Sequence, residues 1–229
     1  MGPRQVKVSV PSAGGAVDVS VRAYQASGDS SPVLIFGHGA GAGQDSPFMV
    51  EFAQALAARD VETVTFNFPY TEQRRRVPDR NDVLEACWRE VVSAVRARVG
   101  PRPVFIGGKS MGGRIASQVV AGPGSDGLGV AGLVFLGYPL HPPGRPHQLR
   151  VGHWPGIRVP ALFVQGARDT FGTSDELREH LPQWGAPTSL IVIEDGDHSL
   201  KVRKGAGRSQ AEIYASVQDA TAEWIRRGV

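Results

Sequence analysis

The residues most able to do chemistry surround Ser110. This serine is the centre of the pattern G-x-S-x-G formed with Gly108 and Gly112, between a predicted strand (103–107) and a predicted helix (111–121). A serine nucleophile is presented by a sharp strand-to-helix turn, where side chains two residues before and after it would collide with their neighbours. Glycine at both positions therefore predicts that Ser110 is a nucleophile for acyl transfer.

A base and an acid follow Ser110 in the order that a serine triad on a parallel sheet requires. His198 lies in a glycine-bearing loop after the last predicted strand, and Asp169 lies at the end of the strand before it. An imidazole accepts and returns a proton near neutral pH, and a carboxylate orients it. We predict a triad of Ser110, His198 and Asp169, and we interpret the adjacent Asp197 as a loop or helix-capping residue.

A glycine-rich loop, 37–43, follows the predicted buried strand 32–36. Such loops expose backbone N–H groups, so we expect the amides of Ala40 and Met111 to be the donors of an oxyanion hole. The loop also fits the dinucleotide pattern G-x-G-x-x-A, but the next strand ends in the letters FNFP, without the carboxylate that would hold a ribose. A nucleotide cofactor is therefore not expected.

A phosphate site and a metal site are both weakly supported. Lys109 and Ser110 resemble the end of a phosphate-binding P-loop, but that loop requires glycine where Pro103 stands. Three histidines recur every six residues from position 141 to 153, yet no carboxylate or thiol joins them at metal-ligand spacing. We predict that the protein uses no cofactor and no metal.

The elements that position these residues alternate along the chain, with an apolar–polar hairpin first and then apolar strands between amphipathic helices. The predicted strands are 5–10, 16–24, 32–36, 61–68, 103–107, 130–137, 160–166 and 188–193, and the predicted helices are 48–59, 79–99, 111–121, 174–181 and 209–227. This pattern predicts a single α/β domain over 1–229, with a mostly parallel sheet of about eight strands, an N-terminal antiparallel hairpin and helices on both faces.

Two local predictions accompany this scheme. The segment 141–158 is rich in proline and glycine and has no helical period, so we expect an ordered loop or a mobile flap there and no helical cap domain. Asp175 stands near the start of the helix 174–181, and we expect it to cap that helix.

The composition is that of an ordinary globular protein. The 229 residues include one cysteine, Cys87, expected in the core, and carry a formal net charge of +3. A lone cysteine forms no internal disulfide and fits a reducing compartment. No apolar run has the length of a signal peptide or a membrane span, and no nucleic-acid motif is present. We expect a cytoplasmic monomer or homodimer with neither membrane nor nucleic acid as a partner.

Several strings of the sequence resemble a known family: FGHGAGAGQDSPFM, FNFPYTEQRRR, GGKSMGGR, GYPLHPPG, LFVQGARDTFG and GDHSLK. The chain resembles the α/β-hydrolase superfamily, within it the small capless group similar to dienelactone hydrolase, and most nearly a set of mostly uncharacterised bacterial and eukaryotic members that includes a subunit of a histone-acetylating complex. The resemblance implies Ser110 as nucleophile, Asp169 as acid, His198 as base, and Ala40 and Met111 as oxyanion donors.

The sequence departs from the wider superfamily in one place. Lys109 precedes the nucleophile, where His, Tyr or Phe is commoner, and the nucleophile itself is serine where dienelactone hydrolase proper has cysteine. The residues expected to contact substrate are His38, Gly39, Lys109, Tyr70 and Arg74.

We predict a serine hydrolase, carboxylesterase-like with thioesterase or peptidase activity as variants, that acts on a small ester, thioester or related acyl substrate. Basic residues near the ends of the parallel strands would rim the pocket and favour an anionic substrate: Arg74–Arg76, Arg145, Arg150 and Lys201. The alternative is a non-catalytic interaction protein built on the same scaffold. A complete triad argues against this alternative, because a scaffold has no reason to keep one.

Overall fold

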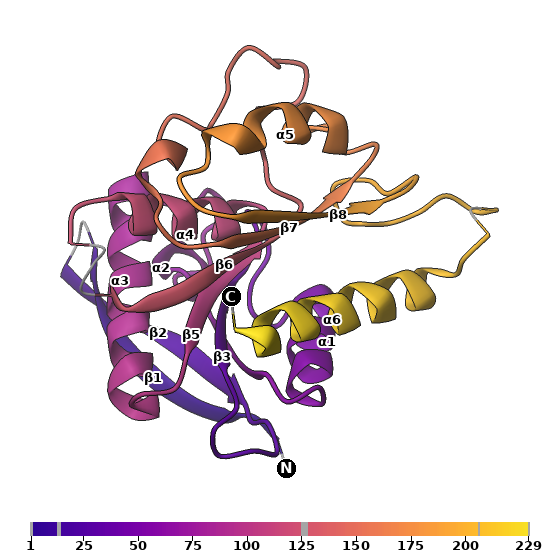
Figure 1. Ribbon diagram of the computed structural model, residues 1–229. Coiled ribbons are helices and arrows are strands. Elements are labelled where there is room, and N and C mark those ends of the chain that lie inside the picture. The colour runs from indigo at the N-terminus through magenta and orange to yellow at the C-terminus, as the bar shows by residue number, and fades with distance from the viewer. Residues whose placement is uncertain (1, 13–14, 125–127, 206, 229) are drawn as a thin grey trace.

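The computed structural model describes residues 2–12, 15–124, 128–205 and 207–228, and one eight-stranded sheet runs through its centre (Figure 1). The strands are β1 (Arg4–Ser12), β2 (Gly15–Tyr24), β3 (Val33–Gly37), β4 (Glu62–Phe66), β5 (Val104–Lys109), β6 (Val130–Leu136), β7 (Ala161–Gly166) and β8 (Thr188–Ile193), in the spatial order β1-β2-β4-β3-β5-β6-β7-β8. The β1–β2 and β2–β4 pairs are antiparallel, and every other pair is parallel. The predicted fold class is confirmed.

Helices cover both faces of the sheet, as a parallel sheet requires. They are α1 (Pro47–Ala57), α2 (Pro69–Glu72), α3 (Asn81–Val99), α4 (Met111–Ala121), α5 (Ser174–His180) and α6 (Gln210–Arg227), with short 3₁₀ turns at Trp154–Gly156 and Leu181–Gln183. Figure 1 shows α3 and α4 together on one face, with α1 and α6 side by side on the other.

The two faces have separate hydrophobic cores, which the alternation of side chains along β3 makes clear. Val33 and Ile35 belong to the core under α3 and α4, whereas Leu34 and Phe36 belong to the core under α1 and α6. Successive side chains of a strand point to opposite faces, so a strand covered on both sides reads as a continuous apolar run. Cys87 lies fully buried in the first of these cores, as predicted.

The segment 141–158 is an ordered loop without a helical cap. The hydroxyl of Tyr138 donates to the carbonyl of Arg150 at 3.0 Å and accepts from the indole N–H of Trp154 at 3.1 Å. Trp154 is fully buried, in one 3₁₀ turn. In Figure 1 this salmon-coloured segment arches above the sheet beside α5. The buried Trp154 and the hydrogen bonds of Tyr138 therefore hold the loop in place.

Two local features differ from the sequence prediction. The one-turn helix α2 is missing from that prediction, which has no element between the strand 61–68 and the helix 79–99. The helix α5 is capped by Thr173, which accepts from the amide of Glu176 at 3.2 Å, and not by Asp175, which pairs with Arg178 on the surface. Asp175 is already inside the first helical turn, so its carboxylate stands too late in the chain to cap.

None of the helices within the described ranges is both long and apolar enough to cross a lipid bilayer.

Candidate active site

Ser110 stands in the sharp turn between β5 and α4. Its backbone has a φ of 49° and a ψ of −116°, a conformation that a residue with a side chain rarely adopts. The turn is tight because Gly108 and Gly112 pack directly on the end of β3, where a Cβ at either position would collide with the carbonyl of Gly37. The two glycines of the sequence pattern therefore allow the approach that exposes Ser110.

Ser110, His198 and Asp169 form one chain of hydrogen bonds. His198 Nε2 lies 2.8 Å from Ser110 Oγ, and His198 Nδ1 lies 2.8 Å from Asp169 Oδ2. The carboxylate is 1% exposed and also accepts from Gln165 Nε2 at 2.9 Å and from the amide of Phe171 at 2.8 Å. Because a carboxylate only accepts, the imidazole proton belongs on Nδ1, which leaves the Nε2 lone pair directed at the serine hydroxyl.

The loops after β7 and β8 bring the acid and the imidazole together. The amide of Arg168 donates to the carbonyl of Gly196 at 2.8 Å, which ties one loop to the other. Asp197 Oδ1 accepts from the amides of Ser199 and Lys201 at 2.7 and 2.9 Å. Asp197 thus shapes the turn beside His198, in agreement with its interpretation as a loop residue.

The glycine-rich loop after β3 is fixed against Ser110 by His38. The Nδ1 of His38 bonds the carbonyl of Gly39 at 2.8 Å, and its Nε2 accepts from the amide of Phe68 at 3.3 Å. The ring is fully buried, and burial lowers the pKa of His38 to about 4, so it is neutral at pH 7. A Cβ on Gly39 would lie only 3.6 Å from the Cβ of Ser110, which shows how closely the loop approaches the serine.

A cavity of about 810 Å³ opens onto Ser110. Four of the predicted triad and oxyanion residues, Ala40, Ser110, Met111 and His198, line it, while Asp169 lies behind His198 and out of contact with the cavity. The lining includes two aromatic rings, Phe48 and Tyr214, whose centroids are 5.7 Å apart, and two guanidinium groups, Arg114 and Arg150; the acidic residues Glu51 and Asp79 also line the cavity.

Comparison with known proteins decides the family. Residues 30–226, most of the chain, match the family described as alpha/beta hydrolase domain. The chain belongs to the α/β-hydrolase family. The resemblance to the subgroup with the histone-acetylating-complex subunit stays a prediction.

Solved structures share the fold of this α/β-hydrolase over its whole length. A dienelactone hydrolase from Anabaena variabilis is 18% identical, with a TM-score of 0.73 and 100% of both chains covered. An α-β serine hydrolase homologue from Coxiella burnetii is 18% identical, with a TM-score of 0.72, 100% of this chain and 98% of that chain covered. A serine hydrolase without a lid from Xanthomonas campestris is 18% identical, with a TM-score of 0.68. The match covers 96% of this chain and 95% of that chain. At 18% identity, these similarities show that the chains share a fold. That fold has no cap domain.

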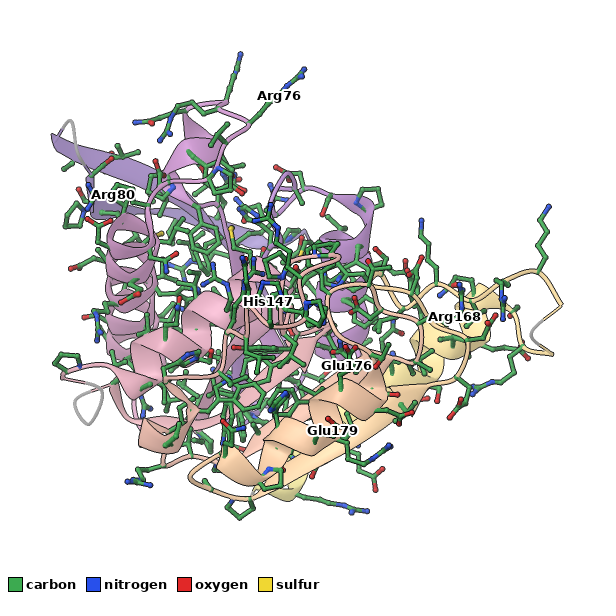
Figure 2. The ribbon with its side chains drawn as sticks, turned by 90° about the horizontal axis from the view of Figure 1, so that it is seen from above. Arg76, Arg80, His147, Arg168, Glu176 and Glu179 are labelled. Carbon is green, nitrogen blue, oxygen red and sulfur yellow. The ribbon has the colours of Figure 1, made fainter. Side chains whose placement is uncertain are left out.

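Of the five residues expected to contact substrate, two line the cavity and three do not. Gly39 and Lys109 line the cavity of this α/β-hydrolase, whereas His38, Tyr70 and Arg74 do not. His38 and Tyr70 are buried beneath the glycine-rich loop, so they support it from behind. Arg74 is exposed outside the cavity, and in Figure 2 its neighbour Arg76 extends from the outer edge of the molecule.

The expected basic rim is only partly present. Arg150 and Lys201 line the cavity, but Arg145 and the run 74–76 lie outside it. Sequence reasoning missed Arg114, which reaches the cavity because it lies one helical turn after Ser110 and so shares its side of α4. The spacing of four residues between Ser110 and Arg114 could have indicated this position from the sequence. Within the described ranges, no group of three or more His, Cys, Asp or Glu side chains is arranged to hold a metal ion.

Proposed function

We propose that this α/β-hydrolase is a serine hydrolase that cleaves a small ester, thioester or related acyl substrate. The observation that carries the proposal is the pair of 2.8 Å hydrogen bonds that connects Ser110 through His198 to Asp169 beside a cavity. A hydroxyl bonded to a neutral imidazole, itself oriented by a buried carboxylate, is the arrangement that activates serine.

The mechanism follows from these positions. Ser110 Oγ attacks the acyl carbon as His198 Nε2 takes its proton, and Asp169 stabilises the resulting imidazolium. His198 then protonates the leaving group as its bond to the acyl carbon breaks, which leaves an ester on Ser110. A water, deprotonated by His198, attacks this ester, and the proton returns to Ser110 as the acyl group departs as an acid.

Two backbone amides are the candidates for stabilising the oxyanion. Ala40 and Met111 line the same cavity as Ser110, the first in the glycine-rich loop and the second at the start of α4. Each donor of this kind lowers the barrier by about 3 kcal/mol. The start of α4 adds the positive end of a helix dipole at the same place.

The guanidinium groups of Arg114 and Arg150 support an anionic substrate. Arg114 donates to Gln118 Oε1 at 3.1 Å and Arg150 to the carbonyl of Pro139 at 3.4 Å, and among the described residues neither guanidinium pairs with a carboxylate. Burial lowers the pKa of both, and the charge of Arg150 lowers that of Arg114 further. A carboxylate on the substrate would supply the missing counter-charge.

A panel of p-nitrophenyl esters and thioesters tests whether the protein is a hydrolase and whether Ser110 is required for hydrolysis. The wild type is expected to hydrolyse at least one neutral ester, and Ser110→Ala is expected to hydrolyse none. No turnover by the wild type on the whole panel would favour the non-catalytic scaffold.

Matched esters of equal length, with and without a carboxylate, test the substrate class. The carboxylated ester should have a kcat/KM about tenfold higher, and Arg114→Gln or Arg150→Gln should remove that advantage while sparing the neutral ester. Equal kcat/KM for the two esters in the wild type would exclude the anionic preference but leave the hydrolase proposal intact.

A further inference from the structure

Lys109 connects the strand of the nucleophile to the loop of the imidazole. It is the last residue of β5, and its ammonium donates a hydrogen bond to the backbone carbonyl of His198. The same side chain lies against the ends of two other strands: a Cβ on Gly39 would be 3.7 Å from Lys109 Cγ, and one on Gly137 would be 2.9 Å from Nζ. One side chain therefore lies beside the loops that follow β3 and β6 and bonds the loop that follows β8.

The loop that carries His198 is also held by bonds to other elements and by bonds within itself. Tyr214 Oη donates to the carbonyl of Ser199 at 3.2 Å and Gln210 Nε2 to the carbonyl of Leu200 at 3.0 Å, both from α6, and the amide of Arg168 donates to the carbonyl of Gly196. Asp197 accepts from the amides of Ser199 and Lys201, and its own amide donates to the carbonyl of Lys201 at 2.9 Å. These bonds form the turn but do not connect it to β5. In the part of the chain that the structure describes, the bond from Lys109 is the one hydrogen bond that holds the backbone of His198.

The environment of the ammonium strengthens this bond. The side chain is half-buried, and burial lowers the pKa of Lys109 to about 8, an effect that the nearby carboxylates of Asp169 and Asp197 oppose. No carboxylate of a described residue forms an ion pair with it. A hydrogen bond from a cation to a carbonyl is stronger than a neutral one, and low dielectric strengthens it further.

We propose that Lys109 is a positioning residue, which holds the His198 backbone so that the imidazole stays within hydrogen-bonding distance of Ser110. The inference rests on the proposed function, because the position of His198 limits turnover only if His198 is the base. It gives Lys109 a role different from the substrate contact expected from sequence, and it explains why a long cationic side chain can stand directly before the nucleophile.

The test compares Lys109→Met with Lys204→Met. Methionine has nearly the length of lysine but no donor, and Lys204 is an exposed lysine of the same loop. For Lys109→Met, kcat on a neutral ester should fall about 10- to 100-fold with KM nearly unchanged, because a catalytic group that shifts slightly loses its alignment. Hydrogen exchange at the amides of Ser199 and Lys201 should become faster. Lys204→Met should change neither quantity.

A chemical rescue distinguishes positioning from general damage to the fold. Lys109→Cys should show the same low kcat, and alkylation of the new thiol with 2-bromoethylamine rebuilds an ammonium at the same reach, so kcat should recover. The natural Cys87 is fully buried and should not react, which treatment of the wild type checks. If Lys109→Met does not fold, the alkylated and unalkylated forms of Lys109→Cys provide the same comparison.

Each result supports or overturns the inference. A lower kcat with faster exchange and recovery on alkylation supports it. Unchanged kcat, unchanged exchange, or a loss that alkylation does not restore overturns it. If the wild type hydrolyses no ester at all, the proposed function fails, while hydrogen exchange still decides whether Lys109 holds the loop.

Discussion

One histidine bonds Ser110 and another lies in the glycine-rich loop beside it, and the surroundings of the two rings differ. The side chain of His198 is 20% exposed and lies between a hydroxyl and a carboxylate, Ser110 and Asp169. His38 is fully buried and lies between the carbonyl of Gly39 on one side and the amide of Phe68 with the hydroxyl of Thr71 on the other. The comparison teaches that the partners of an imidazole, and not its nearness to the nucleophile, decide whether it can act as a base.

The partners of each ring also determine what an added proton would meet. An imidazolium on His198 would face a carboxylate, whereas an imidazolium on His38 would be buried against a backbone amide that donates to it. Burial lowers the pKa of His38 to about 4, so this ring stays neutral and serves as a support. These surroundings fit His198 as the proposed base and His38 as a support for the glycine-rich loop.

The largest expected effect comes from removing the carboxylate behind His198. Asp169→Asn should lower kcat by about 10⁴-fold, since an amide in this place no longer holds the productive tautomer. Steady-state hydrolysis of a neutral ester measures the effect, with the exposed Asp175→Asn as the control. If Asp169→Asn kept most of its activity while Asp197→Asn lost it, the acid would be Asp197.

His38→Gln should affect stability more than chemistry. The amide of glutamine does not reproduce the geometry of the ring between its buried partners, so the free energy of unfolding should fall by about 1–3 kcal/mol, with a loss of kcat far below that of Asp169→Asn. Urea denaturation and ester hydrolysis measure the two quantities. A large loss of kcat at unchanged stability would contradict the supporting role and make His38 part of the chemistry.

The pH dependence of stability should carry the signature of His38. Its pKa is about 4 in the folded state and near 6.5 when unfolded, so the unfolded state takes up the proton first as the pH falls. This contribution is fully present above pH 6.5 and is lost as the pH falls toward 4. Between pH 8 and pH 5 the loss is about 2 kcal/mol.

Urea denaturation at both pH values measures this loss. It should become smaller in His38→Gln and stay the same in His147→Gln, since His147 is exposed (Figure 2). His153, whose pKa burial also lowers to about 4, should account for part of the loss that persists in His38→Gln. An unchanged loss in His38→Gln would show that His38 is not held neutral.

The smallest expected effect is an alkaline decline in turnover that depends on Lys109. As the pH rises through about 8, the ammonium that faces Asp169, Asp197 and His198 loses its charge, and its bond to the His198 carbonyl weakens. A neutral amine still donates, so kcat should fall only in part. The decline should be absent from the already low kcat of Lys109→Met, and its persistence there would assign it to another group.

Much of this arrangement could be predicted from the sequence, because it depends on local chemistry. The continuous apolar runs predicted the parallel strands, and the glycines around Ser110 predicted the tight turn, since a side chain at Gly108 or Gly112 meets the backbone of β3. The order of serine, aspartate and histidine follows from where the strands end.

What the sequence did not predict depends on tertiary packing. Nothing local shows that His38 and Tyr70 face away from the cavity, because that results from the burial of both rings under the glycine-rich loop. The Thr173 cap is an exception, because the local motif T-x-x-E ending in Glu176 indicates it more strongly than the nearby Asp175 does. The bond from Lys109 to His198 joins residues 89 apart in the chain, which no pattern of spacing reveals.

The central claim is that Ser110, activated by His198, is the nucleophile. The most direct measurement is covalent labelling by a fluorophosphonate probe, with the modified residue located by peptide mass spectrometry. Wild type and the exposed control Ser93→Ala should each take up one label, on Ser110, and Ser110→Ala and His198→Gln should take up none. Labelling of Ser110→Ala to the wild-type extent, or no labelling of the wild type, would contradict the account.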